Sequence, residues 1–125
     1  MFVADTDVLV DFLKGLGKAG RVRLELQTGR LCTTSITAFE LWAGARSQQE
    51  ISAVETLLGA TSILPLDPSS ARRAGEIQRD LVRGGAGIGM ADALISGICL
   101  ENDAILLTRN RRHYERVRGL RLGFQ

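Results

Sequence analysis

The sequence predicts a single α/β domain, residues 1–125, with a parallel sheet that helices cover on both faces. Short apolar runs of the kind that form buried strands alternate along the chain with segments whose apolar residues recur at helical spacing. The length of 125 residues is that of one domain, and the sequence contains no internal repeat or linker. In a sheet of this kind ligands gather at the carboxyl ends of the strands.

The first half of the chain is divided into elements by its apolar runs and by the glycines that follow them. Gly15 and Gly29 are typical helix stops, and the apolar run at the N-terminus ends at an acid. We expect strands at residues 2–4, 31–34 and 61–66, and helices at residues 6–14, 18–27, 37–46 and 49–58.

Asp67 and Pro68 mark a helix start in the second half, because a capping aspartate precedes proline at the first helical position. The glycine-rich stretch at residues 84–89 lacks the lysine and hydroxyl residue of a phosphate-binding loop and does not follow a strand. We therefore interpret it as a flexible connection. We expect a buried helix at 91–101, a strand at 104–107, a short helix at 111–117 and an edge strand at 120–122.

Composition places the chain among soluble globular proteins, with 45% apolar and 24% charged residues. No apolar run reaches the ~18 residues that span a bilayer, and the N-terminus lacks the basic segment of a secretory signal. We therefore expect a cytoplasmic protein without a membrane contact. Cys32 and Cys99 lie among apolar residues and are expected to be small buried hydrophobes.

Positive charge is concentrated at the C-terminus. Residues 109–125 carry six arginines and one acid, Glu115, or +5, so residues 1–108 sum to −3 within the net charge of +2. A basic segment on an acidic body favours contact with a polyanion, and a solvated arginine-rich helix is the structural alternative.

Four acids lie where the predicted elements meet. Asp5 ends the first strand, Asp7 follows two residues later and would point to the same side of an extended chain, and Glu40 and Asp92 lie near helix starts. At the carboxyl edge of a parallel sheet their charges would repel one another unless cations neutralised them. Carboxylate oxygens in this number suit Mg²⁺ or Mn²⁺.

Each of these acids also has a purely structural interpretation. Asp5 is a suitable cap for the next helix, Glu40 would complete a capping box with Thr37, and Asp92 would favour a helix dipole. Four convergent acids, in a chain without lysine after Lys18, favour a metal site over three separate caps.

Four segments resemble the motifs of PIN-domain nucleases in order and spacing, over essentially the whole chain. They are residues 3–9, 35–45, 88–95 and 107–114. Small single-domain members of that family, like this chain, are similar to the VapC toxins of toxin–antitoxin pairs. The resemblance implies a three-layer α/β/α sandwich with a central parallel sheet and endonucleolytic cleavage of RNA.

The resemblance also implies the roles of individual residues. Asp5, Glu40 and Asp92 would be catalytic and would hold Mg²⁺ or Mn²⁺ together with Asp7, while Thr108 and Asn110 would support the site. Metal ions would activate a water for in-line attack on the phosphate. This chemistry needs no catalytic histidine, which fits a chain with one histidine, His113.

Two positions depart from the family pattern. Asp7 stands where the family often has asparagine, and Asn110 stands where it often has an acid. We therefore expect Asp7 to supply part of the charge that an acid at position 110 supplies elsewhere.

The partners that we expect are an RNA substrate, a second copy of the chain and a cognate VapB-like antitoxin. The arginines expected to contact RNA phosphates follow the last motif and are Arg109, Arg111, Arg112 and Arg116. Apolar surface around Trp42 and Leu57 would serve the homodimer.

Two other functions are compatible with parts of the sequence. A non-catalytic PIN-like module that binds RNA or protein would explain the missing acid at Asn110. A haloacid-dehalogenase-like phosphatase would use the Asp5-Thr6-Asp7 start, but that class also needs a downstream lysine and a second acidic pair, which the sequence lacks.

Overall fold

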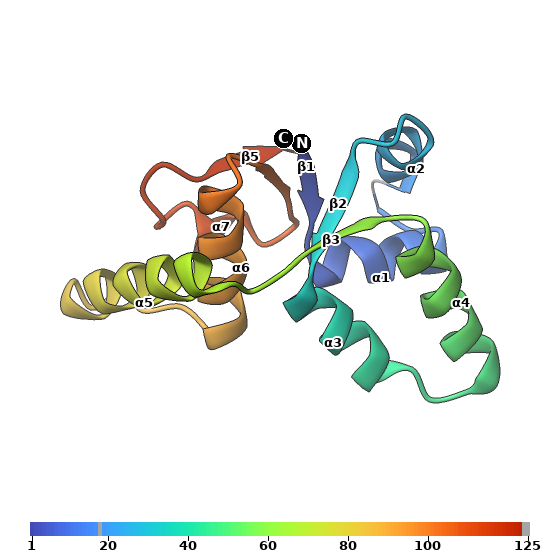
Figure 1. Ribbon diagram of the computed structural model, residues 1–125, viewed down its shortest axis with the longest axis horizontal. Helices are drawn as coiled ribbons and strands as arrows, with labels where there is room; N and C mark the ends of the chain where they lie inside the picture. The colour runs from blue at the N-terminus through green and yellow to red at the C-terminus, as the bar shows by residue number, and fades with distance from the viewer. Residues whose placement is uncertain (18, 124–125) are drawn as a thin grey trace.

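The computed structural model describes residues 1–17 and 19–123 and shows one five-stranded sheet (Figure 1). All four pairings between neighbouring strands are parallel, which confirms the predicted parallel sheet. The strands follow the order β3-β2-β1-β4-β5. Their bounds are β1 Phe2–Ala4, β2 Leu31–Thr34, β3 Ser62–Leu64, β4 Ile105–Leu107 and β5 Arg121–Gly123.

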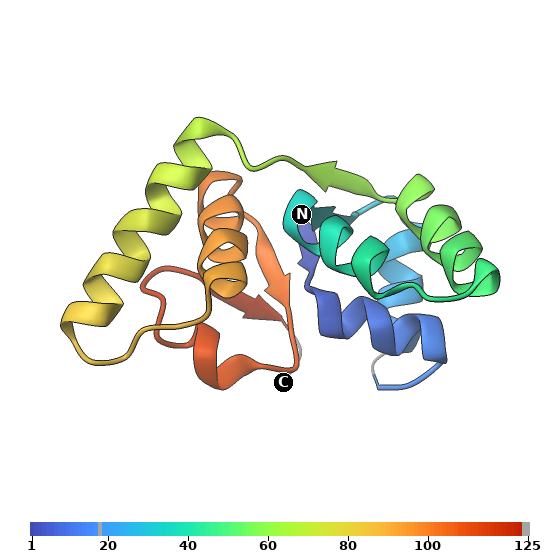
Figure 2. The same cartoon turned by 90° about the horizontal axis from the view of Figure 1, so that it is seen from below.

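Helices cover both faces of this sheet and complete the three-layer sandwich (Figures 1 and 2). Successive strand residues point to opposite faces, so Val3 packs with α6 and α7 while Ala4 packs with the core formed by α1 to α4. The bounds are α1 Thr6–Lys14, α2 Ala19–Gln27, α3 Ser35–Gly44, α4 Gln48–Gly59, α5 Pro68–Arg83, α6 Met90–Glu101 and α7 Arg111–Tyr114. Lys18, the first residue of one predicted helix, lies outside the described residues.

The start of α3 differs from the prediction. The helix begins at Ser35 and not at Thr37, because the Thr34 hydroxyl caps it and accepts the Thr37 N–H at 3.1 Å. The predicted capping box of Thr37 with Glu40 is therefore wrong. Glu40 lies in the second turn of the helix, where its carboxylate is not needed to cap the backbone.

Other boundaries are shorter than predicted, and one surface residue is buried. The strand expected at 61–66 is limited to β3, and the helix expected at 111–117 is limited to α7. Leu57, expected at the surface, is only 4% exposed and packs in the core. Cys32 and Cys99 are free and buried, as predicted.

Two contacts position α6 and the connection that precedes it. A side chain at Gly97 would place its Cβ 2.6 Å from the carbonyl oxygen of Ser70, so only glycine lets α5 and α6 approach this closely. The Gln78 side chain accepts the backbone N–H of Ile88 at 3.0 Å and donates to its carbonyl. The glycine-rich connection, predicted to be flexible, is therefore fixed at its second half. No helix within the described residues is long and apolar enough to cross a bilayer.

Candidate active site

Asp5 lies between the carboxyl ends of β1 and β4 and is 4% exposed. It caps α1: its Oδ1 accepts the Val8 N–H at 3.1 Å. The Thr108 hydroxyl donates to its Oδ2 at 2.5 Å, and the same hydroxyl oxygen accepts the backbone N–H of Asn110 at 2.9 Å. Of the two predicted supporting residues, Thr108 thus contacts Asp5 directly, and Asn110 holds Thr108 through its backbone.

The surroundings of Asp5 disfavour its charge. Burial raises the pKa of its carboxyl to about 6; hydrogen bonds from Thr108 and Val8 oppose the rise, and the charges of Asp7 and Asp92 add to it. Among the described residues, no lysine, arginine or histidine forms an ion pair with Asp5. A cation bound to this carboxylate would offset the cost of burying its negative charge.

Glu40 is held by a threonine that the sequence analysis did not single out. Thr6, the first residue of α1, donates its hydroxyl to Glu40 Oε1 at 2.5 Å and lies 3.2 Å from the Thr37 hydroxyl. Because Thr6 directly follows Asp5, this bond ties Glu40 of α3 to the end of β1. The signal in the sequence is a hydroxyl residue between two acids at a strand end.

Asp92 lies in the first turn of α6 and receives contacts from α7 on both oxygens. Tyr114 donates its hydroxyl to Oδ1 at 3.0 Å, and His113 Nδ1 lies 3.2 Å from Oδ2. Burial, followed by the charge of Asp92, raises the pKa of the Tyr114 phenol well above its usual range. Tyr114 is therefore a neutral donor. The Asn110 side chain completes the group, with Nδ2 2.8 Å from His113 Nδ1.

Asp7 does not share the orientation expected for it. That expectation assumed an extended chain, but α1 begins at Thr6 and places Asp7 in its first turn. The Asp7 side chain is 59% exposed and lies 4.0 Å from Arg109 Nη2, while Arg109 Nε lies 2.8 Å from Asp11. Asp7 acts on Asp5 through its charge, which helps to raise the pKa of that carboxyl.

The four arginines predicted to contact RNA point in different directions. Arg109 pairs with acids of α1, and Arg111 donates to the Gly123 carbonyl at 3.2 Å. Arg112 is exposed on α7. Arg116 reaches the carbonyl of Ala86, at the glycine-rich connection, at 3.5 Å. The arginines therefore do not form one continuous surface.

The donor set fits a hard cation bound through few protein ligands. No three Asp, Glu, His or Cys side chains within residues 1–17 and 19–123 are close enough to form a metal cage. Mg²⁺ is usually held by one or two carboxylates and keeps several waters, so it needs no such cage. A buried carboxylate that is paired only with a hydroxyl and an N–H, with two more acids acting on it, fits that mode of binding.

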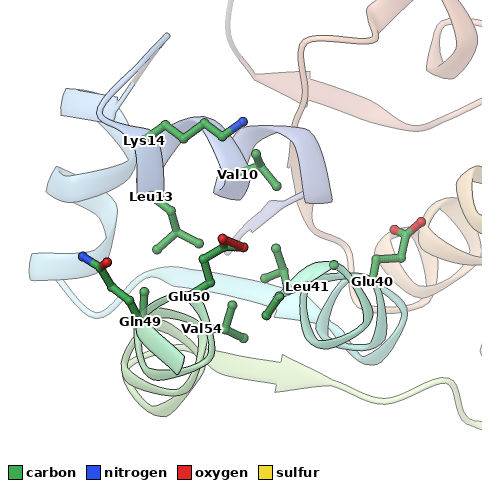
Figure 3. Close-up of a pocket in the computed structure, with 11 residues that line it drawn as sticks. Val10, Leu13, Lys14, Glu40, Leu41, Gln49, Glu50 and Val54 are labelled. Carbon is green, nitrogen blue, oxygen red and sulfur yellow. The ribbon is translucent and has the colours of Figure 1, made fainter. Parts of the chain in front are cut away.

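An apolar groove of about 550 Å³ lies among α1, α3 and α4 (Figure 3). Leu13, Leu41 and Val54 point into it, and Glu50 lies over it. Glu40 borders the groove on α3 but points away from it in this view. Glu40 of α3 thus belongs both to the lining of the groove and to the group of acids.

Comparison with known proteins shows a match to one family model and to relatives that align over nearly all of this chain. The model of the PIN domain matches residues 2–120. The tRNA(fMet)-specific endonuclease VapC of Shigella flexneri is 32% identical over 124 residues, covering 96% of this chain and 94% of the relative. Ribonuclease VapC19 of Mycobacterium tuberculosis is 32% identical over 116 residues, covering 91% and 92%.

Solved structures agree with these relatives. The DNA-bound VapBC complex of Salmonella typhimurium contains a chain that matches with a TM-score of 0.88 and 31% identity, covering 98% of this chain and 96% of that one. VapBC-1 of nontypeable Haemophilus influenzae matches with a TM-score of 0.85, 28% identity and the same coverage. The likeness extends over the sheet, the helices and the segments that carry the four acids.

Proposed function

The chain belongs to the PIN-domain family, and from this membership we propose that it is a metal-dependent endoribonuclease, the toxin of a toxin–antitoxin pair. The observation that carries the proposal is the buried carboxylate of Asp5, which lies at the carboxyl edge of a parallel sheet with the charges of Asp7 and Asp92 acting on it. The VapC relatives are named as ribonucleases, which supports the same activity. We propose that it acts in the cytoplasm.

Asp5, Glu40 and Asp92 are the residues that would hold Mg²⁺ or Mn²⁺, with Asp7 contributing charge from outside. A bound ion of this kind lowers the pKa of a water and stabilises charge on the scissile phosphate. The protein's own contribution is orientation. Hydroxyl donors fix one oxygen of each carboxylate: Thr108 on Asp5, Thr6 on Glu40 and Tyr114 on Asp92.

Hydrogen-bond donors that orient a metal-binding carboxylate from the side away from the metal strengthen metal binding. Each of the three donors comes from a different element from the carboxylate that it holds. The site is thus preorganised by the packing of α1, α3, α6 and α7 around the strand ends. Asn110 supplies no charge, and its side chain lies against His113.

The first test is cleavage of RNA by the purified chain. Because one relative is named for tRNA(fMet), bulk tRNA is the substrate to try first. We expect discrete fragments in Mg²⁺ or Mn²⁺ and none in EDTA, measured by gel electrophoresis of end-labelled RNA. Binding of tRNA without cleavage at any Mn²⁺ concentration would instead identify a non-catalytic PIN-like module. Hydrolysis of a small phosphate ester would identify a phosphatase.

We propose that the chain forms a homodimer through α3. Phe39 is 70% exposed and Trp42 43% exposed, and three residues apart they lie on one side of the helix. Met90, at the start of the neighbouring α6, is 76% exposed. Large apolar side chains grouped at the surface indicate an interaction site. The proposed surface thus includes Trp42, as expected from the sequence, and Phe39 in place of the buried Leu57.

We propose that the apolar groove among α1, α3 and α4 binds a segment of the antitoxin. Similar solved structures are VapBC complexes, and VapBC is named in another as a family of toxin–antitoxin systems, which supports an antitoxin as the partner. A groove lined by Leu13, Leu41 and Val54 suits the apolar face of an amphipathic helix. Lys14 and Glu50 at its border would pair with charged side chains of that helix.

The two protein surfaces can be separated by one crossed experiment. Phe39→Lys should give a monomer that still binds antitoxin, whereas Leu13→Glu should give a dimer that binds antitoxin at least about 10-fold more weakly, since a buried unpaired charge costs several kcal/mol. Light scattering measures mass, and calorimetry measures binding. Leu24→Glu, on the exposed part of α2, is the matched control for Leu13. Equal binding by the Leu13 and Leu24 variants would rule out the groove.

A further inference from the structure

A second groove, of about 370 Å³, lies beside α5, and arginines from two parts of the chain line it. Arg73 and Arg79 come from α5, and Arg116 and Arg118 come from the segment between α7 and β5, which runs beside α5 and α6 (Figures 1 and 2). The floor is apolar and is formed by Ile77, Leu81, Leu100 and Val117. We call this the arginine groove.

The arginine groove carries an excess of positive charge, with four arginines against two acids. Two acids, Glu76 and Asp80, also line it, but Glu76 is 3.9 Å from Arg72, which lies outside. Within the described residues, none of the four lining arginines forms an ion pair with an acid. In the part of the chain that the structure describes, Arg116 is the one of the four with a hydrogen bond, to the carbonyl of Ala86. The groove therefore presents free guanidinium groups to solvent.

The helix α7 and the segment after it link the arginine groove to the candidate active site. Tyr114 and His113, in α7, contact Asp92, and Arg116 and Arg118 follow two and four residues after Tyr114. On the other side, the Ala86 carbonyl that Arg116 contacts lies six residues before Asp92. A polymer that passes the acids could thus continue over α7 into the groove.

We propose that the arginine groove binds the phosphate backbone of the RNA substrate at nucleotides distant from the cleaved bond. This inference rests on the proposed ribonuclease function. Free guanidinium groups match phosphate oxygens in charge and geometry. Arg73 and Arg79 are separated by about 9 Å along the helix axis, at 1.5 Å per residue, so they reach different phosphates. Of the four groove arginines, only Arg116 was predicted from the sequence to contact RNA, because α5 and the last loop meet only in the fold.

The test compares two double variants that lose the same charge. Arg73→Gln with Arg79→Gln removes half of the groove's cations, while Arg46→Gln with Arg83→Gln removes two exposed arginines outside it. Binding of bulk tRNA is measured by fluorescence anisotropy in EDTA, where the proposed cleavage is absent, at several salt concentrations. We expect about 10-fold weaker binding by the groove variant alone. The plot of log affinity against log salt concentration should become less steep by about 1.5 in this variant, since each phosphate contact contributes about 0.7 to 0.9 to the slope.

Each other outcome overturns the proposal. Equal losses in the two double variants would show that only net charge matters. An unchanged slope in the groove variant would show that no phosphate is bound there, and a loss of antitoxin binding instead would make the groove a protein site. Failure of the proposed function gives a different result. If tRNA binds with the expected slopes but stays intact in Mg²⁺, the groove proposal stands and the nuclease proposal is wrong. Melting curves of both variants should match that of the wild type.

Discussion

Asp5→Asn is expected to abolish RNA cleavage and, in the same protein, to raise the melting temperature in EDTA. Loss of the most buried of the proposed metal-binding carboxylates should lower the cleavage rate by roughly 10³-fold or more, because a metal ion contributes several kcal/mol to stabilising the transition state. The stability gain follows from burial, since asparagine removes the charge that the metal-free fold must keep out of water. Function and stability thus change in opposite directions at one residue.

The sign of the pH effect follows from the direction of the Asp5 pKa. Burial raises the pKa of this carboxyl from 3.8 to about 6 in the folded protein, so between these values the folded state holds a proton that the unfolded state has lost. The free energy of unfolding should therefore fall as pH rises from about 4 to 6 and then stay level. The full effect is on the order of 3 kcal/mol.

Denaturation in EDTA at a series of pH values measures this contribution. The wild type should lose stability between pH 4 and 6 relative to Asp5→Asn, and the variant should melt several degrees higher at pH 7.5. Saturating Mn²⁺ should reduce the difference, because it binds only the folded wild type. Asp103→Asn, on an exposed turn, is the control. Equal pH profiles for wild type and Asp5→Asn would contradict a carboxyl with a raised pKa.

The sheet and most helices could be predicted from the sequence because their signals are local. Apolar runs, the Gly15 stop and the Asp67-Pro68 start depend on neighbouring residues, and each predicted element is present. The start of α3 was displaced because several hydroxyl residues stand in a row there, and any of them can cap a helix. Only the fold shows that Thr34 does so while Thr37 faces Thr6.

The candidate site could be predicted only in part, for a physical reason. Acids at strand ends are visible in the sequence because parallel topology brings those ends together. The residues that donate hydrogen bonds to these acids are not visible in the sequence, because Thr6 and Tyr114 contact carboxylates 34 and 22 residues away. The expected orientation of Asp7 was wrong although the helix start at residue 6 was predicted, because it treated residues 5–7 as extended. The separation of Arg109 from Arg116 required the path of α7.

Tyr114→Phe is expected to weaken Mn²⁺ binding and slow cleavage by about 10- to 100-fold while leaving the fold intact. Tyr114 is 1% exposed and packs against the core under α6, and phenylalanine keeps its ring. What is lost is one hydroxyl, the donor to Asp92 Oδ1 at 3.0 Å. Partners that orient a metal-binding carboxylate typically contribute this much to metal affinity or activity.

We expect the loss in Tyr114→Phe to come from orientation of Asp92 and not from proton transfer by Tyr114. Burial and the charge of Asp92 raise the pKa of the Tyr114 phenol well above its usual range, which favours the neutral hydroxyl as a hydrogen-bond donor. The pH profile of cleavage should therefore keep its shape in Tyr114→Phe and decrease uniformly. A changed profile would identify a proton-transfer role.

Calorimetric titration of Mn²⁺ separates orientation from packing at Tyr114. If the hydroxyl orients Asp92, Mn²⁺ affinity falls in Tyr114→Phe although the melting temperature in EDTA changes by only a few degrees, as expected for one hydrogen bond. His113→Asn, which removes the contact to the other oxygen of Asp92, should weaken Mn²⁺ binding less, because His113 is 45% exposed and water can replace it. Equal Mn²⁺ affinity in wild type and Tyr114→Phe would show that the Tyr114 hydroxyl does not orient Asp92 for metal binding. Tyr114 would then contribute only to the packing of the core.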